Sequence, residues 1–292
     1  MTREELVEGA YAAIRDGSKS FRAASRLFDP VTRERAWLLY CWCRHCDDVC
    51  DGQTLGFGSG PAGNVSELRV RTHRAVAGEW QGELPFDALR QLLSECPIPE
   101  TYLADHIDGF MLDEQGWRPQ TEADLERYCY HVAGAVGCMM AILMGVPPED
   151  AETLGYAADL GIAFQLSNIS RDIREDLANG RCYLPNDWFV EFGVCPSSLF
   201  EPENQPALFA MVDRLVRGVE VHERNARKGV SRLPFRSRLA VLAALRIYGT
   251  IGRRVGQLGP AAWDRRVSVS RTRKLAFLVP SFAEALVKGR RS

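Results

Sequence analysis

Apolar residues recur at intervals of three and four along most of the chain, which places them on one face of an α-helix. No segment shows a convincing alternation of apolar and polar residues, the pattern typical of a half-buried strand. We therefore expect one all-α domain over residues 1–292. The spacing predicts helices over these segments: 31–51, 64–78, 99–115, 121–144, 148–178, 206–232, 235–256 and 271–288.

Residues that favour helix ends bound these segments. Asp29 followed by Pro30 is typical of an N-cap and a first helical residue. Glycine and proline clusters indicate breaks at 52–63, 97–99, 145–148, 193–206 and 259–260. Three further helix starts carry candidate capping pairs, namely Thr2 with Glu5, Asn64 with Glu67, and Thr121 with Asp124.

The predicted loop at 52–63 contains a motif that resembles a nucleotide site. Gly58, Gly60 and Gly63 spell G-x-G-x-x-G, which binds dinucleotides only between a strand and a helix. No strand precedes these glycines, so we interpret the segment as a loop and not as a Rossmann site.

Length and composition suit a globular enzyme. The chain has 292 residues, 46% of them hydrophobic, and can bury a sizeable core. Its longest apolar runs, such as Leu239–Leu245, are far shorter than the roughly 20 residues that cross a bilayer, and its start lacks a signal-peptide run. Nine cysteines, four of them in one segment, form a poor disulfide framework. We therefore expect a cytoplasmic protein.

The net charge of −2 conceals an uneven distribution. Residues 224–292 hold 17 basic and two acidic residues, or +15. This leaves 19 of the 36 basic and 36 of the 38 acidic residues, or −17, in residues 1–223. A basic region suits nucleic acid, anionic lipid or phosphate, but basic helices packed beside acidic ones would give the same count. Charge alone does not choose between these interpretations.

The segment CWCRHCDDVCD, residues 41–51, offers two kinds of metal ligand. On a helix, Cys43, Cys46 and Cys50 share one stripe, but the outer two are separated by about 10 Å of helix rise. Zinc sites usually use separated C-x₂-C pairs, so we interpret these cysteines as core packing. Asp47 and Asp51 lie one turn apart on a neighbouring stripe, where both can reach one hard cation.

A second acidic stripe is predicted about 120 residues later in the chain. Asn168, Asp172 and Asp176 follow one another at intervals of four on an otherwise apolar helix. Buried carboxylates are costly unless cations pair with them, and oxygen ligands favour Mg²⁺ or Mn²⁺. Mg²⁺ usually binds through a few carboxylates together with substrate phosphates, so we expect an enzyme that acts on a diphosphate.

Small residues are concentrated between the two stripes. They could leave room for an apolar substrate, or they could only allow close helix packing. These residues are Ala133, Gly134, Ala135, Gly137, Ala141, Ala157, Ala158 and Gly161.

These motifs resemble those of the squalene and phytoene synthases. DDVCD at 47–51 and NISRDIRED at 168–176 are similar to the paired aspartate-rich motifs of that family. The resemblance is strongest to the bacterial phytoene synthases, and it implies a single-domain isoprenoid synthase helical bundle with a central cavity. Further similar segments follow in the family's order over nearly the whole chain: GSKSF at 17–21, YCWCRHCDD at 40–48, YCYHVAGAVG at 128–137, GRCYLP at 180–185 and RVSVSRTRKL at 266–275.

The resemblance also implies roles for individual residues. The implied metal ligands for Mg²⁺ or Mn²⁺ are Asp47, Asp51, Asn168, Asp172 and Asp176, and the four aspartates together with Tyr248 are the implied catalytic residues. The implied diphosphate and substrate contacts are Ser18, Lys19, Ser20, Tyr40, Arg44, Tyr128, Gln165, Asn168, Arg171, Tyr183, Tyr248 and Arg266.

The implied reaction joins two geranylgeranyl diphosphates head to head, through prephytoene diphosphate, to give phytoene for carotenoid synthesis. No nicotinamide cofactor and no nucleic acid partner are expected. The substrate is an amphiphile and the product a hydrocarbon, so we expect peripheral attachment to the inner face of the membrane and contact with other carotenoid-pathway enzymes. Ser25, one turn after Phe21, is a small residue that would deepen the cavity.

Two other functions remain open from the sequence. The first is squalene or dehydrosqualene synthesis from farnesyl diphosphate, which uses the same chemistry in a shorter cavity. The second is a non-catalytic assembly factor on the same fold, which would be expected to have lost the aspartates that are intact here.

Overall fold

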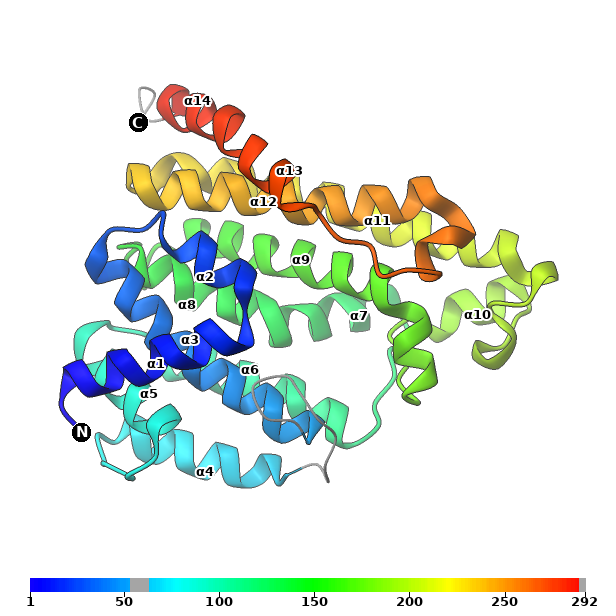
Figure 1. Cartoon of the computed structure of the whole chain (residues 1–292). Coiled ribbons are helices and arrows are strands. Elements are labelled where there is room, and N and C mark those ends of the chain that lie inside the picture. The colour runs from blue at the N-terminus through cyan, green and yellow to red at the C-terminus, as the bar shows by residue number, and fades with distance from the viewer. Residues whose placement is uncertain (53–62, 289–292) are drawn as a thin grey trace.

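Helix α9 runs through the middle of the molecule, and the other helices are arranged around it (Figure 1). The computed structural model describes residues 1–52 and 63–288. Two of the expected G-x-G-x-x-G glycines, Gly58 and Gly60, lie outside these residues. The α-helices are α1 (Arg3–Gly17), α2 (Lys19–Ser25), α3 (Pro30–Asp51), α4 (Val65–Val76), α5 (Leu84–Glu95), α6 (Glu100–Glu114), α7 (Glu122–Cys129), α8 (Ala135–Leu143), α9 (Ala151–Ala178), α10 (Asn186–Phe192), α11 (Gln205–Gly229), α12 (Phe235–Leu258), α13 (Arg271–Ala276) and α14 (Leu278–Lys288).

Short helices of other types complete the described chain. A π-helix, η1 (Tyr130–Gly134), joins α7 to α8. The remaining elements are 3₁₀ turns, namely η2 (Pro196–Ser198), η3 (Pro202–Asn204), η4 (Val230–Arg232) and η5 (Gly259–Trp263). The described residues contain no strand, which confirms the all-α prediction. None of the helices in this part of the chain is long and apolar enough to cross a membrane.

The predicted caps explain where several helices begin. Capping boxes are present at Thr2 and Thr121, and Asn64 accepts hydrogen bonds from the first turn of α4. Asp29 accepts hydrogen bonds from the backbone of Val31 and Thr32, with Pro30 in the first turn of α3. These local signals satisfy the amide groups that a helix start leaves unpaired.

Some predicted boundaries were wrong. The segment expected as one helix over 121–144 is interrupted by the π-helix, and the segment 271–288 is divided at Phe277. Helices α2, α5 and α10 were not predicted. Helices α2 and α10 have seven residues each and offer few turns over which a period can be counted, whereas α5 has 12 residues and its apolar spacing was missed.

Two glycines allow α9 to lie directly against the chain before it. A Cβ atom on Gly161 would lie 2.1 Å from the carbonyl oxygen of Ala133, and one on Gly137 would lie 2.2 Å from that of Ala157. Only glycine fits such a close approach of two backbones. The π-helix and α8 therefore pack on α9 without intervening side chains, so close packing, which the sequence left open, is present at these two positions.

A cavity of about 760 Å³ lies beside this contact. Its lining comes from α2, η1, α8, α9, α11, α12, η4, α13 and α14, and it is mainly apolar. Ala133, Gly137, Ala141, Ala157 and Gly161 all line it, so these small residues also provide space. The volume is in the usual range for small-molecule sites, and the expected central cavity is confirmed.

Candidate active site

Helix α3 carries the first acidic stripe about two turns beyond Tyr40, which packs on the cavity wall. Tyr40 stacks on Phe21, a residue of the cavity wall, with ring centroids 5.4 Å apart. One turn on, the Arg44 guanidinium lies 2.7 Å from Asp47 Oδ2 and 2.6 Å from Asp48 Oδ1. Successive turns of α3 therefore place Tyr40 against the cavity wall, then Arg44, and then the carboxylates of Asp47 and Asp48.

Helix α9 has the same order of residues. Phe164 stacks on Tyr248 of α12 with ring centroids 3.9 Å apart, and both rings line the cavity. Asn168 follows one turn later and Asp172 two turns later, so the apolar wall again leads to carboxylates. Asp172 is ion-paired with Arg171, and it also accepts hydrogen bonds from Arg266 at 3.1 and 3.2 Å.

Arg181 joins the two stripes. Its Nη2 lies 2.7 Å from Asp51 Oδ1 on α3. Burial raises the pKa of both Asp47 and Asp176 of α9, and the charge of Arg181 opposes that rise at each carboxyl group. The two stripes predicted from sequence therefore lie close enough for one guanidinium group to act on both.

A half-buried carboxylate from α6, that of Asp113, lies next to this junction. Asp113 accepts hydrogen bonds from the hydroxyl groups of Tyr128 and Tyr183, both at 2.9 Å. The two tyrosine rings are stacked, with centroids 4.9 Å apart. Burial raises the pKa of Asp113, and the two hydroxyl groups oppose that rise. The arrangement fixes Tyr128 and Tyr183 at the site.

The environment of the stripes works against ionisation of two aspartates. Burial raises the pKa of Asp47 to about 6, although Arg44 opposes the rise. Burial and the charge of Asp172 raise the pKa of Asp176 to about 7. At Asp172 burial is outweighed by Arg171 and Arg266, and its pKa is lowered. A cation bound beside Asp47 and Asp176 would stabilise their charged forms. The raised pKa values of these two carboxyl groups therefore favour binding of further positive charge at the stripes.

The oxygen atoms of the two stripes suit a hard cation that also binds the phosphate groups of a substrate. The stripes offer carboxylate and amide oxygens, which Mg²⁺ and Mn²⁺ prefer. In the part of the chain that the structure describes, the stripe carboxylates do not bring three ligand atoms within 4.8 Å of one another. Such an open set fits Mg²⁺, which binds through one or two carboxylates plus phosphates rather than in an all-protein cage.

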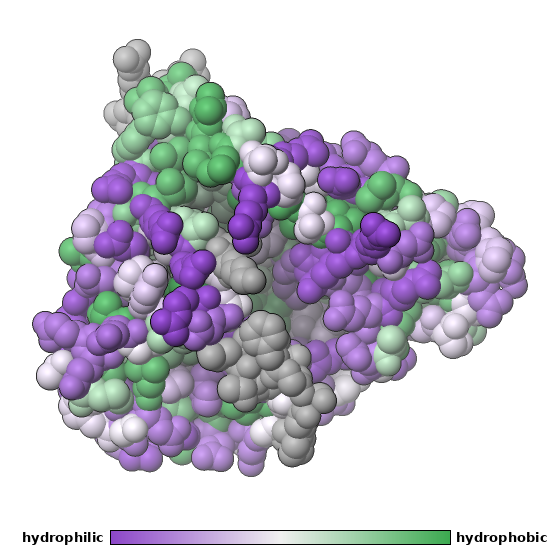
Figure 2. Space-filling model, in the orientation of Figure 1, coloured by the Kyte–Doolittle hydropathy of each residue, from purple (hydrophilic) through white to green (hydrophobic). Residues whose placement is uncertain are grey.

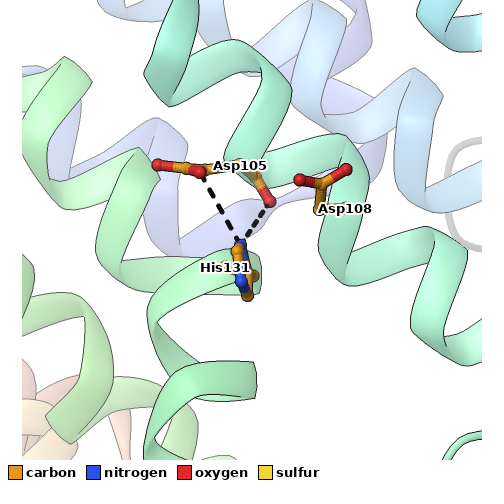
Figure 3. Close-up of side chains that lie close together, drawn as sticks. All are labelled: Asp105, Asp108 and His131. Atoms are coloured by element: carbon orange, nitrogen blue, oxygen red, sulfur yellow. Dashed lines mark hydrogen bonds and ion pairs between the residues drawn. The ribbon is translucent and has the colours of Figure 1, made fainter.

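One other cluster does bring three candidate ligands that close, namely Asp105, Asp108 and His131 (Figure 3). The protein already satisfies it. Nδ1 of His131 donates to the backbone carbonyl of Asp105 at 2.9 Å, and the hydroxyl group of Tyr130 donates to the Asp105 carboxylate at 2.7 Å. Asp108 is ion-paired with Arg69. We therefore assign no metal to this cluster.

The remaining predicted contacts surround the cavity. Ser18 caps α2 by accepting from the backbone of Phe21 at 3.2 Å, and it lines the cavity. Burial raises the pKa of Tyr40 to about 12 and also raises that of Tyr248, so both hydroxyl groups keep their protons at neutral pH. Gln165 is half-buried on α9. The side chains of Lys19 and Ser20 lie outside the described part of the structure.

Comparison with known proteins now adds to this geometry. A family model described as squalene/phytoene synthase matches residues 14–273. The chain belongs to the squalene/phytoene synthase family. It is 41% identical to the 15-cis-phytoene synthase of Pantoea ananas over 100% of this chain and 96% of that protein. It is 44% identical to the 15-cis-phytoene synthase of Enterobacter agglomerans over 92% of each.

Solved structures of the family show the same fold. A crystal structure of a dehydrosqualene synthase in complex with ligand has a TM-score of 0.86, 26% identity and 98% coverage of both chains. The squalene synthase of Alicyclobacillus acidocaldarius has a TM-score of 0.77 at 21% identity and covers 88% of this chain and 95% of that one. The isoprenoid synthase fold expected from the motifs is confirmed.

Three residues of this site were not singled out by the sequence, namely Asp48, Asp113 and Arg181. Asp48 lies off the Asp47 stripe on the helix, but it is buried and ion-paired with Arg44. Asp113 and Arg181 belong to other elements, so no spacing within one helix relates them to the stripes. The GRCYLP segment of the family resemblance contains Arg181, and that was the available signal.

The cysteines of α3 pack as expected. Cys46 and Cys50 are buried in the hydrophobic core and Cys43 packs against it. All are free thiols, and the described residues with three candidate metal ligands close together include no cysteine. In the CWCRHCDDVCD segment, Asp47 and Asp51 therefore face the site and the cysteines face the core.

Proposed function

We propose that the chain joins two geranylgeranyl diphosphates head to head and releases two diphosphates and two protons to give phytoene. One observation carries this proposal: the wall of an apolar cavity of about 760 Å³ leads along α9, and through Tyr40 along α3, to two acidic stripes interleaved with arginines. The apolar part fits prenyl chains and the charged end fits diphosphate held with metal. Two relatives of this chain at 41% and 44% identity are named 15-cis-phytoene synthase.

The residues that would hold Mg²⁺ or Mn²⁺ are Asp47, Asp51, Asn168, Asp172 and Asp176. When bound, the metal would withdraw electron density from the diphosphate and stabilise its negative charge as it leaves. The raised pKa values of Asp47 and Asp176 support this assignment, because such carboxylates gain from a nearby cation.

The arginines of the site contribute fixed positive charge. Arg44, Arg171, Arg181 and Arg266 already lie against the acidic stripes, and their planar guanidinium groups suit phosphate oxygens. Charge placed where the leaving diphosphate develops its own charge lowers the barrier to ionisation. Two such ionisations are needed, first to form prephytoene diphosphate and then to open its cyclopropane ring.

The apolar wall protects the carbocations. Phe21, Phe164 and Tyr248 line the cavity, so their rings would keep water away from the cations. Their ring faces also attract positive charge. Each half-reaction ends with loss of a proton, for which we propose the released diphosphate or a nearby tyrosine such as Tyr248 as acceptor.

The cavity extends far along α9, as an elongated prenyl chain requires. On α9 its lining runs from Phe164 back to Thr153, about 16 Å of helix rise. Ser25 does not contribute directly: it is fully buried, accepts a hydrogen bond from the indole of Trp37 at 3.0 Å and is absent from the lining. The idea that Ser25 itself deepens the cavity is therefore wrong for this structure.

We propose that the enzyme needs no nicotinamide cofactor, acts in the cytoplasm at a membrane surface and passes its product to carotenoid-pathway enzymes. The test is incubation with geranylgeranyl or farnesyl diphosphate, with and without Mg²⁺ and NADPH, followed by identification of the hydrocarbon. Phytoene from geranylgeranyl diphosphate without NADPH is the expected result. Squalene or dehydrosqualene from farnesyl diphosphate alone would identify the other family activity, and no diphosphate release would indicate a non-catalytic protein.

A further inference from the structure

Helices α13 and α14 present a stripe of exposed apolar side chains. Leu275 is 65% exposed, Val279 75%, Phe282 48% and Leu286 46%. They follow one another at intervals of four, three and four residues, so they lie along one face. Figure 2 shows hydrophobic surface gathered over α14 at the upper left of the molecule. We call these four residues the apolar stripe.

The apolar stripe is continuous with the cavity. Leu275 lines the cavity and is also the first residue of the stripe. Leu278, one residue before Val279, lines the cavity as well. Apolar surface therefore passes from the interior of the cavity to the outside of the molecule at the junction of α13 and α14.

The charges around the stripe are basic. Arg271 and Arg273 of α13 are exposed, and Arg271 lies at the edge of the cavity. Glu284 is the only acidic residue between positions 265 and 288. Its carboxylate is held by Arg227 at 2.8 Å and by Arg246 at 2.7 Å, so it adds no uncompensated negative charge to this face.

We infer that the apolar stripe docks on an anionic lipid surface and that the cavity opens there to pass its hydrocarbon product into the lipid. This inference rests on the proposed function. A hydrocarbon without polar groups gains nothing from leaving through water, whereas a continuous apolar route into lipid keeps it unhydrated. A helix with an apolar face beside cationic side chains is the arrangement that binds in a membrane interface.

A second protein fits this surface less well. Stable protein interfaces use about 20–30 residues on each side, whereas the apolar stripe consists of four side chains. Lipid needs no such area, because apolar insertion and attraction of cations add together. Pairing with a second copy is therefore an outcome that the test must detect.

The test uses the full chain with V279S, F282S and L286S combined. None of these three side chains lines the cavity. The matched control combines V70S, V190S and V221S, which replace exposed valines on α4, α10 and α11. Flotation with vesicles of phosphatidylcholine, with and without phosphatidylglycerol, measures binding at low and high salt. We expect wild type and control to float with the anionic vesicles and the stripe variant to lose roughly tenfold or more of its binding.

Activity separates this inference from the proposed function. Diphosphate release in a single turnover in detergent should agree within about twofold between the stripe variant and wild type, because the changes lie outside the cavity lining. Steady-state formation of phytoene with vesicles should fall. No diphosphate release by wild type would overturn the proposed function, whereas normal release with unchanged vesicle binding of the stripe variant would overturn the lipid inference alone.

Two further measurements complete the test. The double variant V279S/L286S leaves the edge-to-face contact of Phe282 with Phe235 in place and replaces the triple variant if that one does not fold. It should lose roughly threefold of the vesicle binding. Sedimentation without lipid detects self-association. A wild-type dimer that becomes monomeric in the stripe variant would show that a second copy covers the stripe, against our inference.

Discussion

The pKa values of two carboxylates in this molecule, Glu95 and Asp176, are shifted in opposite directions. Glu95, at the end of α5, is bound by Arg3 at 2.6 Å and by Arg35 at 3.1 Å, and Gln91 donates to it at 2.9 Å. Burial opposes its charge, but these partners lower its pKa to about 2. Asp176, in the acidic stripe of α9, has its pKa raised to about 7 by burial and by Asp172.

The contrast indicates what each group contributes. A carboxylate with a lowered pKa stabilises the folded protein in its charged form, so Glu95 ties α1, α3 and α5 together. A carboxylate with a raised pKa is held at a cost to the fold, and such groups are concentrated at functional sites. The difference predicts that substitutions in the two groups have opposite effects on activity and stability.

The largest effect is expected in the acidic stripes. Asp47→Asn, Asp51→Asn, Asp172→Asn and Asp176→Asn should each lower kcat at least about a hundredfold, because they remove charge that would bind metal and diphosphate. The melting temperature without metal should stay level or rise for Asp176, which is half-buried beside Asp172, and it should change less for Asp47, whose ion pair with Arg44 offsets the like charges around it.

Diphosphate release with saturating Mg²⁺ measures the first effect and thermal unfolding the second. Added Mg²⁺ with diphosphate should raise the melting temperature of wild type by binding the native state, and it should do so less in each variant. Near-normal activity in all four variants would rule out the proposed metal site.

Helix α3 carries both kinds of residue: Asp47 and Asp51 belong to the acidic stripe, whereas its cysteines pack in the core. Combining Cys43→Ala, Cys46→Ala and Cys50→Ala should lower the free energy of unfolding by about 3 kcal/mol, or about 1 for each lost sulfur. Activity per folded molecule should remain. Metal analysis of the purified wild type is the control, and stoichiometric zinc would contradict the assignment of these cysteines to packing.

A smaller loss is expected where two backbones meet beside the cavity. Gly161→Ala should destabilise the protein by about 2 kcal/mol, because the new methyl group would overlap the Ala133 carbonyl. Gly155→Ala on the same helix is the matched control, since no atom lies within 4 Å of its added Cβ. It should be neutral or stabilising by up to about 1 kcal/mol from helix propensity. Equal unfolding midpoints for the two variants in urea would show that the backbone around Ala133 and Gly161 moves apart without cost, against this prediction.

The smallest effect is expected at Glu95. Glu95→Gln should cost about 1 kcal/mol at pH 7 and leave kcat unchanged. Because the folded pKa of Glu95 is lowered from 4.5 to about 2, its contribution is present above pH 4.5 and disappears as the pH falls toward 2. The difference in unfolding free energy between wild type and variant should therefore shrink across that window. A difference that stays constant from pH 6 to pH 3 would contradict the lowered pKa.

The sequence predicted contacts within one helix but not contacts between elements, because the helical repeat relates only residues that are close along the chain. Asp47 and Asp51, like Asp172 and Asp176, are four residues apart, so the helical repeat alone placed each pair on one face. The relation between Asp113 and the two tyrosines depends on how α6, α7 and the segment after α9 pack, and no local spacing contains that information. The π-helix at Tyr130–Gly134 was missed for a similar reason, since its extra residue per turn is invisible in an otherwise helical pattern.

The turn that ends α9 has a consequence for anyone who recombines this chain with a relative. The backbone amide of Arg181 donates to the Asp176 carbonyl at 2.8 Å, and Gly180 has a φ of +77°, which suits glycine. The same turn directs the Arg181 guanidinium onto Asp51. A chimaera whose crossover falls between residues 176 and 181 would take Asp176 from one parent and Arg181 from the other, joined by a turn that is part of each. Crossovers should therefore be placed outside this turn, so that its glycine, its arginine and its aspartate are inherited together.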